Sequence, residues 1–306
     1  MGDLKLFRIE NGTVTELLGL AFALEKPLQQ LIEQNMETLF GVRFVASEHS
    51  TGQKQAGRID SLGLDENGSP VIFEYKRSVN ENVINQGLFY LDWLLDHKAE
   101  FELLVMKKLG NNVAEQIDWS SPRLVCVASD FTRYDEHAIA QINRSIELVR
   151  YRDYNGEYLT LDLVVSTTAS TIITREEGSS RRSSRSTTEK TVTQVLEQVS
   201  EDLKNLYDML DVFLMSMGDD VAKTANKYYF AYRRIKNFAC VEIHPQTKKL
   251  LIYLKADLLN ITLETGFTRD VTNIGHYGTG NLEVTIGSRQ TLEKAQPLII
   301  SSYQLS

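Results

Sequence analysis

The 306-residue sequence contains few of the residues on which several large functional classes depend. It has two cysteines, Cys126 and Cys240, and each lies in an apolar run in a different half of the chain. This excludes a disulfide framework and predicts two reduced, buried thiols. The five histidines are scattered, and no Cys/His cluster has the spacing of zinc ligands.

Long apolar runs are also missing. None approaches the ~20 residues that a membrane-spanning helix needs. Met1-Gly2-Asp3 lacks the basic and apolar segments that open a signal peptide, so we expect a cytoplasmic protein that contacts no membrane. A glycine-rich phosphate loop and a nucleophile elbow are likewise absent. The apolar fraction of 42% is ordinary for a globular chain, and this length is sufficient for two domains.

Basic residues are outnumbered, with 33 Lys and Arg against 41 Asp and Glu, a net charge of −8 and a pI near 5.3. Proteins that coat nucleic acid nonspecifically are usually basic, so this class is disfavoured. A local basic lip remains compatible with the sequence, because Arg58 and Lys76 lie within the segment that carries the main motif and Arg77 follows it, with Arg43 and Lys54 nearby. The alternative is that these residues form a solvated rim.

That segment, from Gly57 to Lys76, places three charged side chains on one predicted β-hairpin. Asp60 lies among apolar residues, and Glu74 and Lys76 are two apart on the next strand, so they share a face. Asn67-Gly68 is expected to supply the two φ > 0 positions of a tight turn. If the register places Asp60 opposite, two carboxylates and an ammonium converge where Mg²⁺ or Mn²⁺ could bind. The alternative is a solvated, ion-pairing strand edge.

A helix is predicted over residues 80–97, directly after this hairpin, from the helical spacing of its apolar residues. Gln86 and Tyr90 are an i, i+4 pair and therefore share a face of it. By itself, a polar and an aromatic residue at this spacing usually only pack against each other on a helix and have no functional role. Its position immediately after the charged hairpin makes it a second feature of the same candidate site.

Asp60 followed by Glu74-Tyr75-Lys76 resembles the PD-(D/E)xK nuclease superfamily, with Ile59 in place of the proline of the family's name. Gln86-x-x-x-Tyr90 is similar to a motif of the RecB-like branch. The resemblance implies an α/β fold, a restriction-endonuclease-like mixed sheet flanked by helices. It also implies that Asp60 and Glu74 bind Mg²⁺ or Mn²⁺, that Lys76 positions the attacking water, and that Gln86 and Tyr90 support the site and the nucleic-acid strand.

An amphipathic helix is predicted over residues 24–40, with Gly41 as its C-cap. Its apolar stripe comprises Leu28, Leu31, Ile32, Met36, Leu39 and Phe40. The segment is similar to the opening helix of NucS-like mismatch endonucleases, and in the superfamily a first-helix glutamate often completes the metal site. Glu25 is the first choice, Glu33 the second and Glu37 the third. For each, the alternative is an ordinary exposed glutamate.

Further patterns divide the chain. Residues 1–173 form the predicted nuclease-like domain, with an added hairpin at 5–18, strands at 42–48, 123–129, 146–151 and 158–166, and a helix at 134–143. Residues 174–190 contain no apolar side chain and are predicted to be a flexible Ser/Arg-rich linker. Residues 191–306 form a predicted α+β domain that resembles an uncharacterised domain of unknown function.

In this second domain we predict a helix over 192–217, strands at 228–233, 238–244 and 249–255, and a final helix over 290–303. Basic and aromatic residues interleave between Lys223 and Lys236, a composition that stacking plus phosphate contact would use. Simple alternation along a strand that fills one sheet face explains the same pattern and is favoured.

The sequence therefore predicts a Mg²⁺- or Mn²⁺-dependent nuclease that hydrolyses DNA phosphodiester bonds, in DNA repair or defence. DNA is the expected partner, and a homodimer is compatible with the sequence. The alternative is a non-cleaving nucleic-acid-binding or sensing module on a nuclease scaffold. A third, weaker alternative is a purely structural interaction protein.

Overall fold

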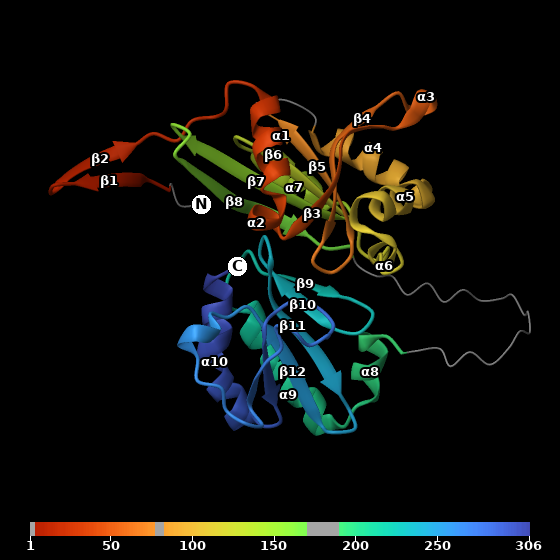
Figure 1. The fold of residues 1–306 in the computed structure, drawn as a ribbon, viewed down its shortest axis with the longest axis vertical. Helices are drawn as coiled ribbons and strands as arrows, with labels where there is room; N and C mark the ends of the chain where they lie inside the picture. The colour runs from red at the N-terminus through yellow and green to blue at the C-terminus, as the bar shows by residue number, and fades with distance from the viewer. Residues whose placement is uncertain (1–3, 77–82, 170–189) are drawn as a thin grey trace, which may run out of the picture. The chain divides into compact units, whose positions relative to one another are not determined.

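The computed structural model describes residues 4–76, 83–169 and 190–306, in two compact units, Met1–Thr167 and Thr168–Ser306 (Figure 1). Within the described ranges, no helix is long and apolar enough to cross a membrane. Apart from Lys190, the predicted linker lies outside these ranges. Arg77 and the first three residues of the helix predicted at 80–97 also lie outside them.

The first unit is built on a six-stranded mixed sheet of order β3-β4-β5-β6-β7-β8. Its strands are β3 (Val42–Ser50), β4 (Arg58–Asp65), β5 (Pro70–Lys76), β6 (Arg123–Ala128), β7 (Ser145–Tyr154) and β8 (Tyr158–Thr167). β5, β6 and β7 run parallel, and the remaining pairs are antiparallel. β6 is buried along its whole length, as expected for a parallel strand covered on both faces.

Helices cover both faces of this sheet, which confirms the predicted α/β class. They are α1 (Glu25–Gln34), α2 (Met36–Phe40), α3 (Gly52–Gln55), α4 (Val83–Asp96), α5 (Lys98–Leu109), α6 (Asn111–Ala114) and α7 (Arg133–Ala140). Phe73 packs edge-on against Phe40 of α2, with ring centroids 5.0 Å apart. Its neighbour Ile72 belongs to the core with Leu91 and Leu94 of α4. Because adjacent strand residues face opposite ways, α1–α2 and α4 form separate layers.

The helix predicted over residues 24–40 is two helices, so that prediction was wrong in its continuity. Asn35 leaves the helical conformation at φ −125° and ψ 20°, and its side-chain amide donates to the Leu31 carbonyl at 2.9 Å. Asparagine competes with the helical backbone in this way. Leu31 of the predicted apolar stripe is exposed, whereas Gln29 is buried. Gly41 does form the expected left-handed C-cap, at φ +64°.

The turn between β4 and β5 also differs from the prediction. Gly68 has a positive φ of 80° and Asn67 does not. The Asp65 carboxylate accepts from the backbone N–H groups of Asn67 and Ser69, both at 2.8 Å, so an Asx turn replaces the expected two-residue turn. Asn11 and Gly12, at φ 49° and 80°, do form such a turn in the predicted N-terminal hairpin of β1 (Leu6–Glu10) and β2 (Thr13–Leu17). This hairpin stands away from the sheet of its unit (Figure 1).

Helix α5 was not predicted. Phe101 and Val105, four residues apart and fully buried, are the signal that was available in the sequence. Because α5 packs with α4 in the core, it thickens the layer that covers one face of the sheet.

The second unit contains an antiparallel sheet of order β13-β14-β12-β11-β10-β9 packed on helices, which confirms the predicted α+β class. Its elements are α8 (Val192–Gln198), α9 (Glu201–Met215), β9 (Ala222–Ala225), β10 (Phe230–Arg233), β11 (Asn237–His244), β12 (Lys249–Leu254), η1 (Leu258–Asn260), β13 (Thr268–Asp270), β14 (Leu282–Ile286) and α10 (Arg289–Gln304). The helix predicted at 192–217 is interrupted, because Val199 and Ser200 are extended. β9, β13 and β14 were not predicted.

Two of the interleaved aromatic residues of this unit pack inward on one face of the sheet. Phe230 and Tyr232 are buried in the core that includes α9, and the Tyr207 and Tyr232 hydroxyls lie 3.1 Å apart. Lys223 pairs with Asp211 at 2.6 Å. Strand alternation therefore accounts for this part of the basic and aromatic pattern.

Candidate functional site

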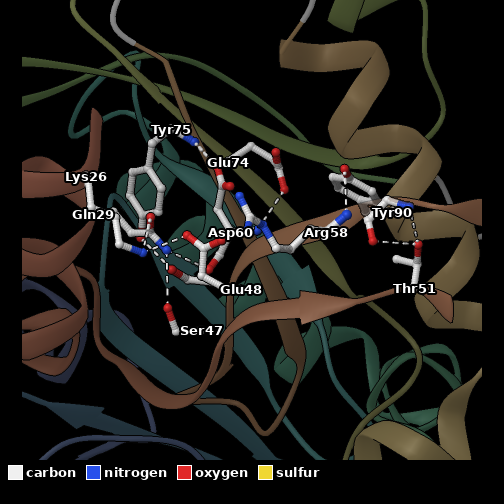
Figure 2. Close-up of polar contacts among 12 residues, drawn as sticks. Lys26, Gln29, Ser47, Glu48, Thr51, Arg58, Asp60, Glu74, Tyr75 and Tyr90 are labelled. Carbon is white, nitrogen blue, oxygen red and sulfur yellow. Dashed lines mark hydrogen bonds and ion pairs between the residues drawn. The ribbon is translucent and has the colours of Figure 1, made fainter. Parts of the chain in front are cut away.

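Asp60 and Glu74 meet where the β4–β5 backbone ladder ends. The last paired residues are Ser61 and Phe73. One step beyond, the Tyr75 N–H donates to Asp60 Oδ2 at 3.0 Å, and the Asp60 N–H donates to Glu74 Oε1 at 3.4 Å (Figure 2). Carboxylate oxygens thus replace the backbone acceptors at this end of the hairpin. The predicted register, with Asp60 opposite Glu74, is what the structure contains.

Both carboxyl groups are withdrawn from water. Glu74 is fully buried, and its Oε2 has no hydrogen-bond partner among the described residues. Burial, and next the neighbouring Asp60 carboxylate, raises the pKa of Glu74 to about 9. Burial likewise raises the pKa of Asp60. The pair therefore retains a proton that ordinary carboxyl groups lose, because two desolvated carboxylates side by side are costly.

Lys76 and Glu25 lie beside this pair. Lys76 Nζ is 4.0 Å from Glu25 Oε2, and only 17% of the Lys76 side chain is exposed. Its positive charge opposes the rise in the pKa of Asp60 and of Glu74 but does not outweigh burial. The structure therefore brings together the three predicted hairpin residues and the first-choice glutamate of α1.

The other two candidate glutamates are placed differently. Glu33 Oε1 accepts from Ser61 Oγ at 2.6 Å, from Ser47 Oγ at 2.7 Å and from Gln29 Nε2 at 2.8 Å. These bonds fasten α1 to β3 and β4, and they orient the Glu33 carboxylate toward serines rather than toward Asp60. Glu37 is exposed on α2.

Gln86 and Tyr90 anchor the start of β4. Gln86 Nε2 donates to the Tyr90 hydroxyl at 3.2 Å, and the same oxygen accepts from the Arg58 N–H at 3.1 Å. A Cβ on Gly57 would lie 2.6 Å from the Tyr90 ring, so the ring and the backbone approach as closely as glycine allows. The pair thereby fixes the chain two residues before Asp60. Its contact with nucleic acid stays a prediction.

Sequence reasoning missed two residues at the site. Gln29 Nε2 donates to the Asp60 carbonyl at 2.8 Å and so holds the backbone of that residue. Glu48 lies between the pairs Ser47–Ser61 and His49–Ile59 and is therefore opposite Asp60 on β3. Gln29 follows Leu28 of the apolar stripe, and this position in the sequence indicated that the Gln29 side chain would be buried. Nothing in the sequence sets the β3–β4 register that brings Glu48 here.

The predicted basic lip is only partly present. Arg58 opens β4 and Lys76 closes β5, so both adjoin the pair. Arg43 lies opposite Leu64, toward the other end of β3.

The donor set suits a magnesium-like ion. Across the described part of the chain, no group of three or more His, Cys, Asp and Glu side chains could hold a metal ion. Asp60 and Glu74 therefore offer two carboxylates, and Mg²⁺ is typically bound by one or two carboxylates together with waters and substrate phosphates. The unpartnered Glu74 Oε2 is an acceptor that such a cation would satisfy. A structural zinc or calcium site would need more protein ligands.

Comparisons with known proteins cover both units. A family model described as a domain of unknown function (DUF5655) matches residues 192–306, which confirms the expected uncharacterised C-terminal domain. An uncharacterised protein of Haemophilus influenzae is 28% identical over 301 residues, covering 97% of this chain and 98% of the relative. A solved EndoMS–dsDNA complex aligns with 20% identity and a TM-score of 0.25 over 42% of this chain. The alignment spans 46% of that solved chain, less than half of its length.

Proposed function

We propose that the first unit is a divalent-metal-dependent deoxyribonuclease whose site is Asp60, Glu74 and Lys76. One observation carries the proposal: the fully buried carboxyl group of Glu74 has an oxygen with no hydrogen-bond partner in the described part of the chain, beside a second desolvated carboxyl group. Burying such groups without a structural partner is costly. Carboxyl groups with strongly shifted pKa values are concentrated at functional sites, where binding or catalysis requires the buried charge.

Asp60 and Glu74 would hold Mg²⁺ or Mn²⁺. The bound ion supplies a Lewis acid for the phosphate and lowers the pKa of a water molecule. The chain fixes the geometry before any substrate arrives: Tyr75 orients the Asp60 carboxylate and Gln29 holds its backbone. Glu25 would be a third, more distant carboxylate of the site, beside Lys76.

Lys76 has a separate role in this proposal. Its ammonium is largely withdrawn from solvent and held near Glu25, so its charge is poorly screened. An ammonium in that position can hold the attacking water by hydrogen bonding and stabilise the negative charge that develops on the phosphate oxygens. Gln86 and Tyr90 support the site through the start of β4.

The second candidate is a DNA-binding module that does not cleave. It is favoured by one observation, that no third carboxylate completes a metal-holding group in the described ranges. A setting in DNA repair or defence stays a prediction from the resemblance for either candidate.

The test uses the full chain with linear, nicked, branched and mismatched DNA in Mn²⁺, with EDTA as the control. We expect EDTA-sensitive cleavage, and its loss in Asp60→Ala and Lys76→Ala at unchanged circular dichroism. Glu37→Ala, which alters an exposed residue of α2, is the matched control and should cleave normally. Full activity in both site variants would reject the assigned roles, and binding without cleavage on every DNA would select the second candidate.

A further inference from the structure

Glu48 has a backbone conformation that is rare for its residue type. Its φ of +52° lies in the left-handed region, within strand β3. The two flanking residues contact opposite layers: Ser47 donates to Glu33 of α1, and the His49 ring packs against Trp93 of α4. Side-chain alternation would place both on one face. The left-handed residue therefore breaks the alternation of β3, and its own side chain reaches Lys26 of α1 and Arg58 of β4.

The Glu48 carboxylate lies between two cations. Glu48 Oε1 accepts from Lys26 Nζ at 2.7 Å, and Glu48 Oε2 is 2.5 Å from Arg58 Nε (Figure 2). Lys26 lies in the first turn of α1, and Arg58 is the first residue of β4. Both cationic side chains remain accessible, 49% and 67% exposed, whereas the Glu48 side chain is 27% exposed. One carboxylate thus fixes two outward-facing cations from different elements.

Stability does not explain this arrangement. Exposed ion pairs contribute little to folding, and the left-handed backbone opposes it. The pairing leaves donors on both cations: the Nη groups of Arg58 lie beyond the Nε that pairs with Glu48, and the Lys26 ammonium, which also donates to Gln29 Oε1 at 3.3 Å, has a third hydrogen. Glu48, which pairs with both cations, lies opposite Asp60, and Arg58 precedes Asp60 by two residues.

The acidic site would repel the phosphates of DNA, and these cations would offset that repulsion. DNA carries one negative charge per phosphate, and the chain carries a net charge of −8. Phosphates that approach Asp60 and Glu74 therefore need local positive charge at a fixed position. Lys26 and Arg58 supply it from the start of α1 and the start of β4.

We propose that Glu48 is a positioning residue that presents Lys26 and Arg58 as a clamp for the DNA backbone phosphates that flank the bond to be cut. The proposal rests on the proposed function and adds its substrate contact. The clamp recognises phosphate charge and spacing, and it carries no base specificity.

The test is the salt dependence of DNA binding by the full chain, measured by fluorescence anisotropy with a labelled duplex of about 30 base pairs in EDTA. Each lost phosphate contact lowers the slope of log K against log salt by about 0.9, so Lys26→Ala/Arg58→Ala should lower it by about 2. We expect the affinity at low salt to fall about tenfold. Lys5→Ala/Arg8→Ala is the matched control, because it removes two exposed cations at the N-terminal hairpin, which are paired with Glu16 of β2 and with Glu157 of the β7–β8 turn. It should leave the slope unchanged.

Glu48→Gln separates positioning from simple charge. Removing a negative charge should raise DNA affinity if only net charge matters, whereas loss of the two ion pairs should lower it, by about threefold, if Glu48 holds the clamp. Glu48→Gly, which adopts positive φ without strain, is the second variant and should lower affinity in the same way. Circular dichroism of each variant verifies that it is folded.

The outcomes distinguish the clamp from the nuclease. An unchanged slope in the Lys26/Arg58 variant, an equal loss in the control variant, or a gain of affinity in Glu48→Gln overturns the clamp, even if the protein cleaves DNA. Wild-type protein that binds no DNA at low salt overturns it as well. Binding that depends on Lys26 and Arg58 without cleavage of any DNA keeps the clamp and rejects the nuclease.

Discussion

The backbone N–H of Tyr75 donates to Asp60 Oδ2 at 3.0 Å, in the place where a continuing β-ladder would use a backbone carbonyl. The orientation of the Asp60 carboxylate is therefore set by the neighbouring strand itself. This bond uses one of the two oxygens of that carboxylate. The hairpin therefore both carries the Asp60 carboxylate and sets its orientation.

The first prediction separates the two roles of Asp60. Asp60→Asn retains an oxygen acceptor for the Tyr75 N–H, so we expect its free energy of unfolding to stay within about 1 kcal/mol of the wild type while cleavage is lost. Asp60→Ala leaves that N–H unpaired and should cost about 1–3 kcal/mol. Urea denaturation and a cleavage assay measure both effects. Equal stability of the two variants would contradict the structural role.

The second prediction concerns pH. The pKa of Glu74 is raised from 4.5 to about 9 by burial and by Asp60. Between these values the folded protein binds a proton that the unfolded chain has released, so the free energy of unfolding falls as pH rises, by up to about 1.4 kcal/mol per unit. Glu74→Gln has no such proton and should show a flatter dependence. Urea denaturation at pH 6 and at pH 8.5 in EDTA tests this, and parallel curves for the two proteins would count against it.

The third prediction concerns metal. A divalent ion relieves the repulsion between Asp60 and Glu74, so Mn²⁺ should raise the melting temperature of the wild type. The stabilisation reaches about 2.7 kcal/mol at a hundredfold excess over Kd. Glu74→Ala should show no shift. Glu33→Gln, altered at the serine-bonded glutamate of α1, is the control and should keep the shift. An unshifted wild type at millimolar Mn²⁺ would argue against the site.

The fourth prediction concerns Tyr90. Tyr90→Phe removes the acceptor of the Arg58 N–H and the partner of Gln86, so we expect a loss of about 1–3 kcal/mol in stability. Because this hydroxyl fixes the chain two residues before Asp60, cleavage by the folded variant should also fall, about tenfold. Tyr134→Phe, at an exposed residue of α7, should change neither quantity. Normal cleavage by Tyr90→Phe would show that the hydroxyl does not position Asp60.

The fifth prediction concerns a buried ion triad away from the site. Arg123 of β6 pairs with Asp65 at 3.0 Å and with Glu147 at 2.7 Å, and all three are buried. Arg123→Met leaves two buried carboxylates without their cation and should cost about 3–5 kcal/mol. Adding Glu147→Gln should restore part of this loss, because it removes one of the two stranded charges. Denaturant titrations of both variants are the measurement, and an additive further loss would contradict the pairing.

The arrangement of the hairpin residues could be predicted from the sequence because it depends on local rules. Two-residue alternation places Glu74 and Lys76 on one face, and the turn residues define where the hairpin folds back. The choice between Glu25 and Glu33 was not local, since it depends on how α1 lies across β3 and β4. Glu48 could not be predicted for a similar reason. Strand register and a left-handed backbone place it opposite Asp60, and neither can be inferred from the composition or spacing of the nearby residues. Asn35, which divides the first helix, was the missed local signal.

The Asx turn between β4 and β5 also limits how this site can change. Asp60 and Glu74 are 14 residues apart and lie opposite each other only because the turn returns the chain in one register. Lengthening or shortening the turn by one residue would bring Phe73 or Tyr75 to the level of Asp60 and carry Glu74 to the opposite face of the sheet. The Asp65 carboxylate, which accepts from the Asn67 and Ser69 N–H groups, holds the turn at this length. The number of residues in this turn is therefore a requirement of the site in its own right.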